Sequence, residues 1–136
     1  KGNAISFRTE RERRKTLSVL GTWEACARNM IDGVVYGYEA KLKIVYSHFP
    51  MKLSVENDRI VVQNFLGEKE TKRSKIVGGC KVEVKKDEVI ITGISKENVG
   101  HTVTNLERTT RVMGYARRIF QDGCFMTQKA MAVGKK

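Results

Sequence analysis

This 136-residue sequence lacks long apolar runs, clustered cysteines and paired histidines. No stretch contains the roughly 18 consecutive apolar residues typical of a membrane-spanning helix, so we expect no membrane partner. Cys26, Cys80 and Cys124 are widely spaced, and no C-x-x-C pair accompanies the two solitary histidines. The sequence therefore predicts no metal site. No signal-peptide pattern is visible, which favours reduced thiols and a cytoplasmic location.

Glycine-rich phosphate loops are also missing. The stretch "GEKETKRSK" contains one glycine and lacks the spacing of a P-loop. The stretch "IVGGCKVEV" has two glycines, but a strand pattern follows them where a dinucleotide fold needs a helix. We therefore expect no nucleotide cofactor, and none of any other kind.

Positive charge is abundant. The chain has 26 Lys and Arg against 15 Asp and Glu, which gives a net charge of +11 and a pI near 9.8. Such a surface repels itself unless it meets a polyanion. Nucleic acid is the first candidate and an anionic membrane surface the second, but with no apolar run that could span a bilayer the membrane interpretation is the weaker one and is not adopted.

Two helices are predicted from apolar residues at intervals of three and four. The first runs from Leu17 towards Gly33 and Gly37, and it follows "KGNAISF", which has the pattern of a strand. The second begins at Ser95, a good N-cap, and ends at Gly114. The spacing predicts a buried face of Val99, Val103, Leu106 and Thr110. The outward face would carry His101, Thr104, Arg108 and Arg111.

The region between the helices is predicted to be rich in strands. Leu42, Ile44 and Tyr46 alternate with Lys41, Lys43 and Val45 in a strand with one apolar face. Two hairpins follow, with turns at Asn57-Asp58 and Lys86-Asp87. The hairpins are separated by the polar, basic stretch "LGEKETKRSKIVGG", which we expect to be a loop. The sequence thus predicts an α+β fold with antiparallel sheets.

A catalytic site is not apparent in the sequence. Cys124 lies among apolar residues of a predicted strand and has no neighbouring base to form a thiolate. Asp122 has no partner carboxylate, and Asp122-Gly123 is a common turn pair. A small hydrolase using Cys124 or Asp122 is the least favoured alternative, and we predict that the protein is not an enzyme.

Basic side chains gather in two segments. One comprises Lys69, Lys72, Arg73 and Lys75, and the other Arg108, Arg111, Arg117, Arg118 and Lys129. From Gly100 to Lys136 there are seven positive residues and two negative ones. Either cluster alone could be a solvated surface, but both together favour phosphate binding through counterion release.

The motifs that the sequence lacks indicate which type of nucleic acid is bound. The sequence has no helix-turn-helix, zinc-finger or basic-zipper spacing, so DNA is not an expected partner. It also lacks an aromatic strand motif for stacking bases. Five aromatic residues are expected in the core, namely Trp23, Tyr36, Tyr38, Tyr46 and Phe49. Recognition of folded RNA by shape and backbone is therefore favoured over base stacking.

A series of ordered motifs resembles a known family. These are "KLKIVYSHFP", "NFLGEK", "GGCKVEVKKDEVIITGISKENVGHT", "NLERTTRV" and "RRIFQDGCF". They resemble the large-subunit ribosomal proteins of family six, called family nine in older eukaryotic naming. The resemblance extends from about Thr16 to Lys129. The stretch "VMGYARRIFQDG" is typical of the archaeal and eukaryotic branch.

The resemblance implies two tandem α/β domains, each an antiparallel sheet packed on one helix. Here residues 1–37 would be the end of the first domain, residues 38–129 the RNA-binding second domain, and residues 130–136 a basic tail. Because the chain starts without Met, we expect an N-terminally truncated family member. The implied RNA-facing positions carry Lys72, Arg73, Arg108, Arg111, Arg117 and Arg118.

The function implied is structural. The family binds large-subunit ribosomal RNA near the sarcin–ricin loop, beside neighbouring ribosomal proteins and docking translation factors. We therefore predict a cytoplasmic constituent of the large ribosomal subunit. A non-ribosomal RNA-binding module, acting in RNA processing or ribosome assembly, remains the alternative.

Overall fold

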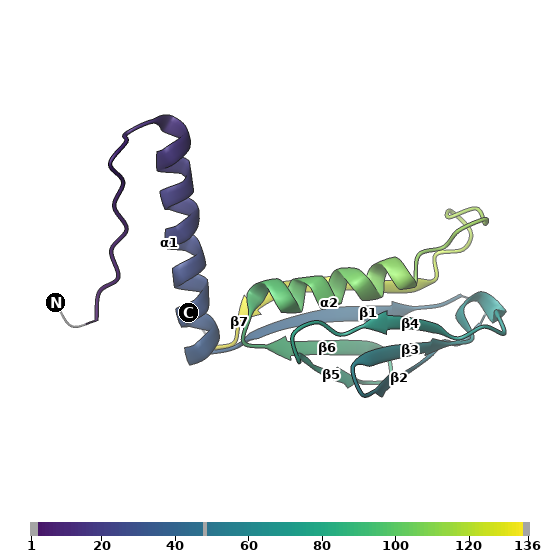
Figure 1. Ribbon diagram of the computed structural model, residues 1–136. Helices are drawn as coiled ribbons and strands as arrows, with labels where there is room; N and C mark the ends of the chain where they lie inside the picture. The colour runs from purple at the N-terminus through teal and green to yellow at the C-terminus, as the bar shows by residue number, and fades with distance from the viewer. Residues whose placement is uncertain (1–2, 48, 135–136) are drawn as a thin grey trace.

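The computed structural model describes residues 3–47 and 49–134, and in these ranges two α-helices accompany seven strands (Figure 1). The elements in chain order are α1 (Arg14–Val35), β1 (Tyr38–Val45), β2 (Lys52–Glu56), β3 (Arg59–Gln63), η1 (Phe65–Gly67), β4 (Lys72–Lys75), β5 (Lys81–Val84), β6 (Glu88–Gly93), α2 (Lys96–Thr109) and β7 (Gly123–Ala132).

Two antiparallel sheets enclose the core, with strand orders β5-β6-β1-β7 and β2-β3-β4. Helix α2 contacts β1, β6 and β7 of the first sheet and β4 of the second (Figure 1). It thus covers the side where β7 and β4 form the sheet edges, while β2 and β5 contact each other on another side. The predicted α+β fold with antiparallel sheets is confirmed.

Both predicted hairpins are present. Asn57 has a φ of +49° at the turn between β2 and β3, where Glu56 pairs with Arg59. The β5–β6 hairpin pairs Val84 with Val89 around the Lys86-Asp87 turn. Asparagine suits the first turn because its short polar side chain tolerates a positive φ.

The stretch between the hairpins differs from the prediction, because Lys72–Lys75 form strand β4 and pair with β3. Polar residues can form an edge strand because one of its faces meets solvent. Side chains of α2 bond to the free backbone of this segment: Asn105 Nδ2 donates to the Lys75 carbonyl at 3.2 Å, and Val77 N–H donates to Thr102 Oγ1 at 3.1 Å.

Helix α2 begins as predicted but ends earlier. The Ser95 side chain accepts a hydrogen bond from Asn98 N–H, and Glu97 lies in the first turn. The helix ends at Thr109, so Arg111 lies in the following segment and not on the helix. The Thr110 hydroxyl bonds back to the Leu106 carbonyl and accepts from Cys124 N–H, which ties the helix end to β7.

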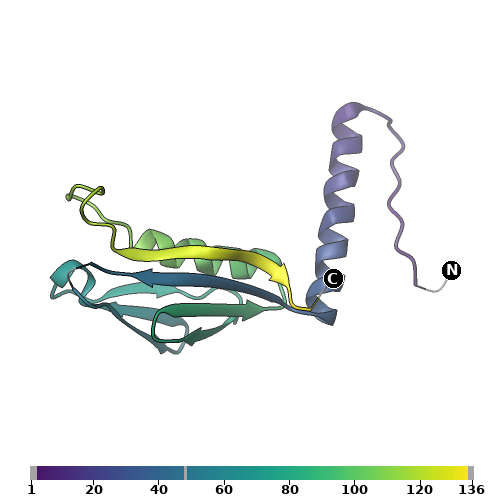
Figure 2. The same ribbon diagram turned by 180° about the vertical axis from the view of Figure 1, so that it is seen from behind.

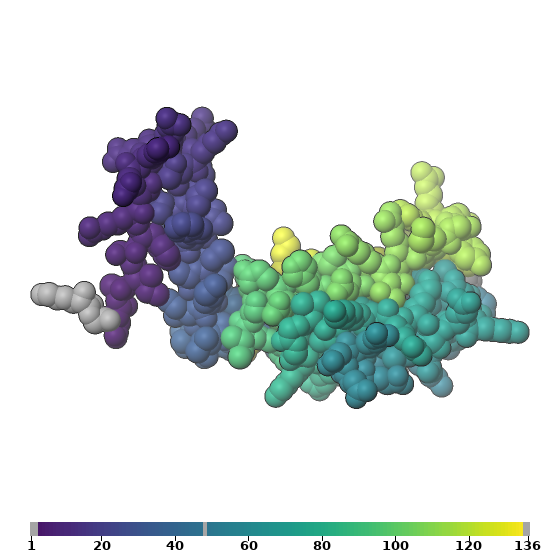
Figure 3. All heavy atoms as spheres, in the orientation of Figure 1, coloured from purple at the N-terminus to yellow at the C-terminus, as the bar shows by residue number. Residues whose placement is uncertain are grey.

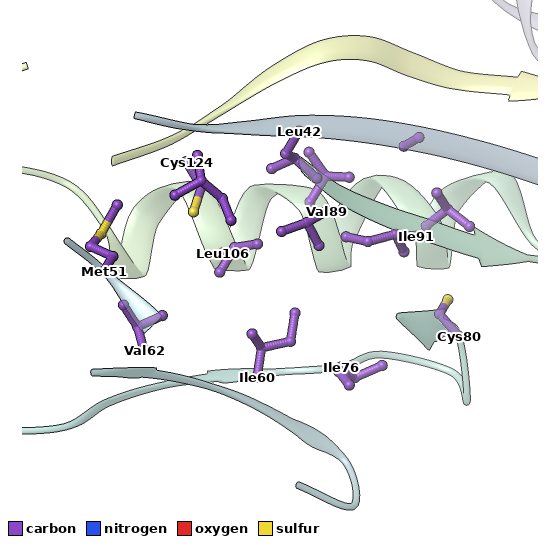
Figure 4. Close-up of a cluster of buried hydrophobic side chains, with 14 of the residues drawn as sticks. Leu42, Met51, Ile60, Val62, Ile76, Cys80, Val89, Ile91, Leu106 and Cys124 are labelled. Atoms are coloured by element: carbon purple, nitrogen blue, oxygen red, sulfur yellow. The ribbon is translucent and has the colours of Figure 1, made fainter. Parts of the chain in front are cut away.

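The predicted apolar face of α2 is buried. Val99, Val103 and Leu106 pack with Leu42 of β1 and other residues from both sheets. Figure 4 shows side chains from β1, β3, β6 and α2 pointing into this common core. Burying apolar surface between the layers is the main favourable contribution to folding.

Helix α1 was correctly predicted as a helix, but its apolar stripe is exposed. It extends away from the sheets (Figures 1 and 3), and Trp23 is 53% exposed, contrary to the predicted core position. Phe7 lies beside Trp23, with ring centroids 6.0 Å apart. The strand predicted around Phe7 is wrong for the described residues 3–13, because no neighbouring strand pairs with their backbone.

Two glycines determine where α1 meets the sheets. Gly33 lies so close to the Ile94 carbonyl that a Cβ at this position would overlap it. Gly37 has a φ of +75° just past the helix, and its N–H donates to the Gly33 carbonyl at 3.0 Å. At the other end of the chain β7 continues to Ala132, and Val133 N–H donates to the Gly37 carbonyl.

Truncating Leu106 to Ala should lower the free energy of unfolding by about 2–5 kcal/mol, because the side chain is fully buried and would leave a cavity between the layers. Urea denaturation followed by circular dichroism measures this loss. Met113→Ala, at an exposed position just beyond α2, is the control and should change stability by less than about 0.5 kcal/mol. Equal effects of the two variants would contradict the assigned core.

Candidate nucleic-acid interface

The predicted basic residues occupy three places in the fold. The first group, here called the β4 cluster, consists of Lys69, Lys72, Arg73 and Lys75. The second, here called the loop cluster, consists of Arg108, Arg111, Arg117 and Arg118. Lys129 lies within β7, about 20 Å from its first residue at the usual rise per residue, and so belongs to neither group.

The two faces of β4 differ. Ser74 points into the core, so Arg73 and Lys75 point outward in the alternating pattern of a strand. Lys72 shares the face of Ser74, and its Nζ lies 4.3 Å from the centroid of the Phe65 ring and 3.5 Å from Glu68 Oε2. Its charge is therefore partly engaged within the protein.

Sequence reasoning missed two residues on this outer face. Arg59 pairs with Lys75 across the β3–β4 ladder, and Lys52 lies on the same face of β2. The alternation of the β2–β3 hairpin placed both opposite the core. Their proximity to the β4 cluster could not be predicted because β4 was expected to be a loop.

Arg111, Arg117 and Arg118 of the loop cluster lie on the segment that joins α2 to β7, and Arg108 lies in the last turn of α2. The segment projects at the end of the molecule away from α1 (Figure 2). Hydrogen bonds hold both ends of this segment. Glu107 Oε1 accepts from Met126 N–H at 2.9 Å, and Asp122 Oδ1 accepts from Ser47 N–H and Oγ–H at 3.1 and 2.9 Å. These bonds position the arginines between them.

The turn within this segment is not at the predicted place. It includes Arg117, Arg118 and Ile119, and the Ala116 carbonyl accepts from the N–H groups of Ile119 and Phe120. Asp122 is instead a buried residue, 2% exposed, immediately before β7. The prediction of an Asp122-Gly123 turn is therefore wrong, because the carboxylate bonds to a distant loop.

The arginines of the loop cluster are available to an external anion. All four are exposed, and Arg108 lies in the last turn of α2, where the helix dipole favours a cation. Apart from Lys72, none of the nine predicted residues has a carboxylate oxygen within 4.0 Å in the described ranges. An unpaired guanidinium can bind phosphate through two parallel hydrogen bonds.

Cys124 is unsuited to nucleophilic chemistry. It is 1% exposed, and burial, partly offset by the hydrogen bond with Thr110, raises the pKa of its thiol to about 11. Nearby Glu107 raises the pKa further through charge repulsion. The thiol therefore stays protonated near neutral pH, as expected for a core residue.

Metal-ligand clusters and membrane-spanning helices are absent from the described residues. No group of three or more His, Cys, Asp or Glu side chains there is arranged to hold a metal ion. Neither of the two helices described is long and apolar enough to cross a bilayer. What the described residues do present is a basic surface on a small α+β fold.

Comparison with known proteins identifies the family. Residues 49–123 match the family model described as Ribosomal protein L6. The chain is 46% identical over 127 residues to the large ribosomal subunit protein uL6 of Methanobrevibacter smithii, a match that covers 93% of this chain and 71% of the relative. The chain therefore belongs to the ribosomal protein L6 family, which is structural and not enzymatic.

Two further relatives show the same extent of similarity. The protein uL6 of Picrophilus torridus is 42% identical, with 92% of this chain and 69% of the relative covered. That of Haloquadratum walsbyi is 42% identical over 96% of this chain and 72% of the relative. All three are archaeal, in agreement with the branch indicated by the sequence motifs.

In the folded protein, Cys124 should resist alkylation near pH 8, whereas half-buried Cys26 should react, because the raised pKa leaves Cys124 almost no thiolate. Since the pKa of the folded thiol lies above its ordinary value of 9.0, the stability from the neutral thiol is present below about pH 9 and is lost towards pH 11. Iodoacetamide labelling with peptide mass spectrometry, repeated in denaturant as a control, measures the difference. Rapid labelling of native Cys124 would contradict this.

Proposed function

We propose that this protein is a structural constituent of the large ribosomal subunit and binds large-subunit ribosomal RNA through its phosphate backbone. Membership of the ribosomal protein L6 family supports the ribosomal role, since the relatives are named as large ribosomal subunit proteins. The observation that carries the RNA contact is the loop cluster, whose arginines are exposed, unpaired in the described ranges and held at both ends of their segment.

The binding mode follows from the charges. Arg117 and Arg118 occupy one turn, and Arg111 precedes it on the same segment, so three exposed arginines lie within a short stretch of chain. Each phosphate neutralised releases condensed counterions, which provides affinity without reading sequence. The outward face of the β4 cluster, with Arg73 and Lys75, offers a second set of phosphate contacts.

The basic residues are expected to contribute unequally to RNA affinity. Lys72 is tied to Glu68 and the Phe65 ring, so it contributes less than Arg73 in this proposal. Lys129, on the middle of β7, would contact a different part of the RNA from the loop cluster. Lys69 lies in the exposed bend before β4, where it adds a further positive charge beside the RNA backbone in this proposal.

The location within the subunit rests on the family resemblance. We propose that the RNA site is near the sarcin–ricin loop, that other ribosomal proteins are neighbours, and that the protein supports the region where translation factors dock. In this role the protein is rigid and acts by bracing RNA. A cytoplasmic location in assembled ribosomes follows.

Replacing Arg117 and Arg118 together with Gln should weaken binding to large-subunit ribosomal RNA and reduce the slope of log affinity against log salt by about two, because two phosphate contacts are lost. Filter binding at several salt concentrations measures both quantities. Lys85→Gln with Lys86→Gln removes the same charge from the exposed β5–β6 turn and serves as the matched control. An unchanged slope in the arginine variant would contradict the phosphate clamp.

The ribosomal role predicts co-sedimentation of the wild-type chain with large subunits at moderate salt. Crosslinking in intact ribosomes, followed by mapping of the RNA sites, should give adducts near the sarcin–ricin loop. Recovery of the protein only in ribosome-free fractions would overturn the ribosomal role. Crosslinks confined to a distant RNA region would overturn only the proposed location.

A further inference from the structure

An open hollow of about 640 Å³ lies at the base of the segment that carries the loop cluster. It is lined by side chains from the end of α2, the α2–β7 segment and the start of β7. Val112, Phe120 and Phe125 provide apolar walls, and Arg111 and Arg117 line it together with them. The two arginines assigned to phosphate binding therefore border a cavity that phosphate contact alone does not use.

The polar groups of the hollow are of two kinds. Glu107 and Asp122 contribute carboxylates, and Gln121 contributes an amide. Asp122 Oδ1 is satisfied by Ser47, but the buried Oδ2 atom has no hydrogen-bond partner among the described residues. Oδ2 is closed to solvent, so the carboxylate that a donor in the hollow can reach is that of Glu107, which is only partly buried. A ligand with an N–H donor would be stabilised beside it.

Resting on the proposed RNA-binding function, we propose that this hollow receives one unstacked base of the ribosomal RNA, with the adjoining phosphates held by Arg111 and Arg117. A free phosphate fits poorly because the carboxylates of Glu107 and Asp122 would repel it inside the hollow. A nucleotide meets both requirements. Its base has an apolar face and N–H donors on its edge, and its phosphates carry the negative charge.

The aromatic residues provide the stacking surface. Phe125 is 51% exposed although it borders the hollow, so one side of its ring is available to a base. The Phe120 ring packs against Tyr115 with a centroid distance of 4.9 Å, which supports the opposite part of the wall. At this hollow, the proposed binding mode therefore includes base stacking as well as backbone contact, although the sequence favoured backbone contact alone.

The test is chemical probing of large-subunit ribosomal RNA bound to the wild-type chain, with dimethyl sulfate and a carbodiimide as probes of unpaired base edges. We expect at least one unpaired base to be protected by the wild type and to become reactive with Phe125→Ala. The same variant should bind about tenfold more weakly, since it loses one aromatic stacking partner. Its salt slope should be unchanged because every arginine remains.

Two further variants make the result specific. Gln121→Leu removes an exposed amide of the hollow, which donates to the Arg118 carbonyl at 3.2 Å, and should expose the same base. Met131→Ala truncates an exposed side chain elsewhere on β7 and should alter neither protection nor affinity. Thermal unfolding of each variant shows that the chain is folded, and Gln121→Leu decides the matter if Phe125→Ala does not fold.

A steep salt response without any base protection that depends on Phe125 or Gln121 would overturn the base-binding proposal and leave the phosphate clamp intact. A flat salt response of the wild type would overturn the clamp itself. The probing result would still decide whether the hollow holds a base, so the two failures can be told apart.

Discussion

The packing of α2 between the edges of β4 and β7 holds the rest of the domain in place. Its apolar face, centred on Leu106, joins the two sheets through one core. Polar side chains then bond to both edges: Asn105 of the helix donates to the Lys75 carbonyl, and Thr110, directly after the helix, accepts from Cys124 N–H. Because an open sheet edge exposes unpaired backbone groups, these bonds both close the fold and fix the strands beside α2.

Both basic clusters depend on this helix. The β4 cluster lies on or just before the strand that α2 covers along one edge, and the loop cluster begins in the last turn of α2 and continues on the segment before β7. Mutual repulsion between the arginines would favour spreading apart if the segment were free. The bonds of Glu107 and Asp122 oppose this by fixing the ends of the segment. A basic surface held in one arrangement loses less conformational entropy when it meets RNA.

Much of the fold was predictable because it depends on local patterns. The two hairpins, the Ser95 cap and the buried face of α2 were all visible as alternation, turn residues or helical spacing. The strand β4 was missed because "KRSK" has no apolar alternation of its own, and only its pairing with β3 makes it a strand. The exposure of Trp23 was missed for a related reason, since an amphipathic helix predicts a buried stripe but not which neighbour covers it.

The sequence by itself determined the charge excess, the family motifs and the absence of a nucleophile with its base, because each depends on residue identity and short spacing. Only the tertiary structure decided which basic residues act together. Lys72 is engaged by Glu68 and Phe65, while Arg111 and Arg117 border one hollow with Phe125. The role of Asp122 was also decided there, because its partner Ser47 lies 75 residues away in the chain. Contacts at that separation are fixed by the packing of whole layers, which no local pattern encodes.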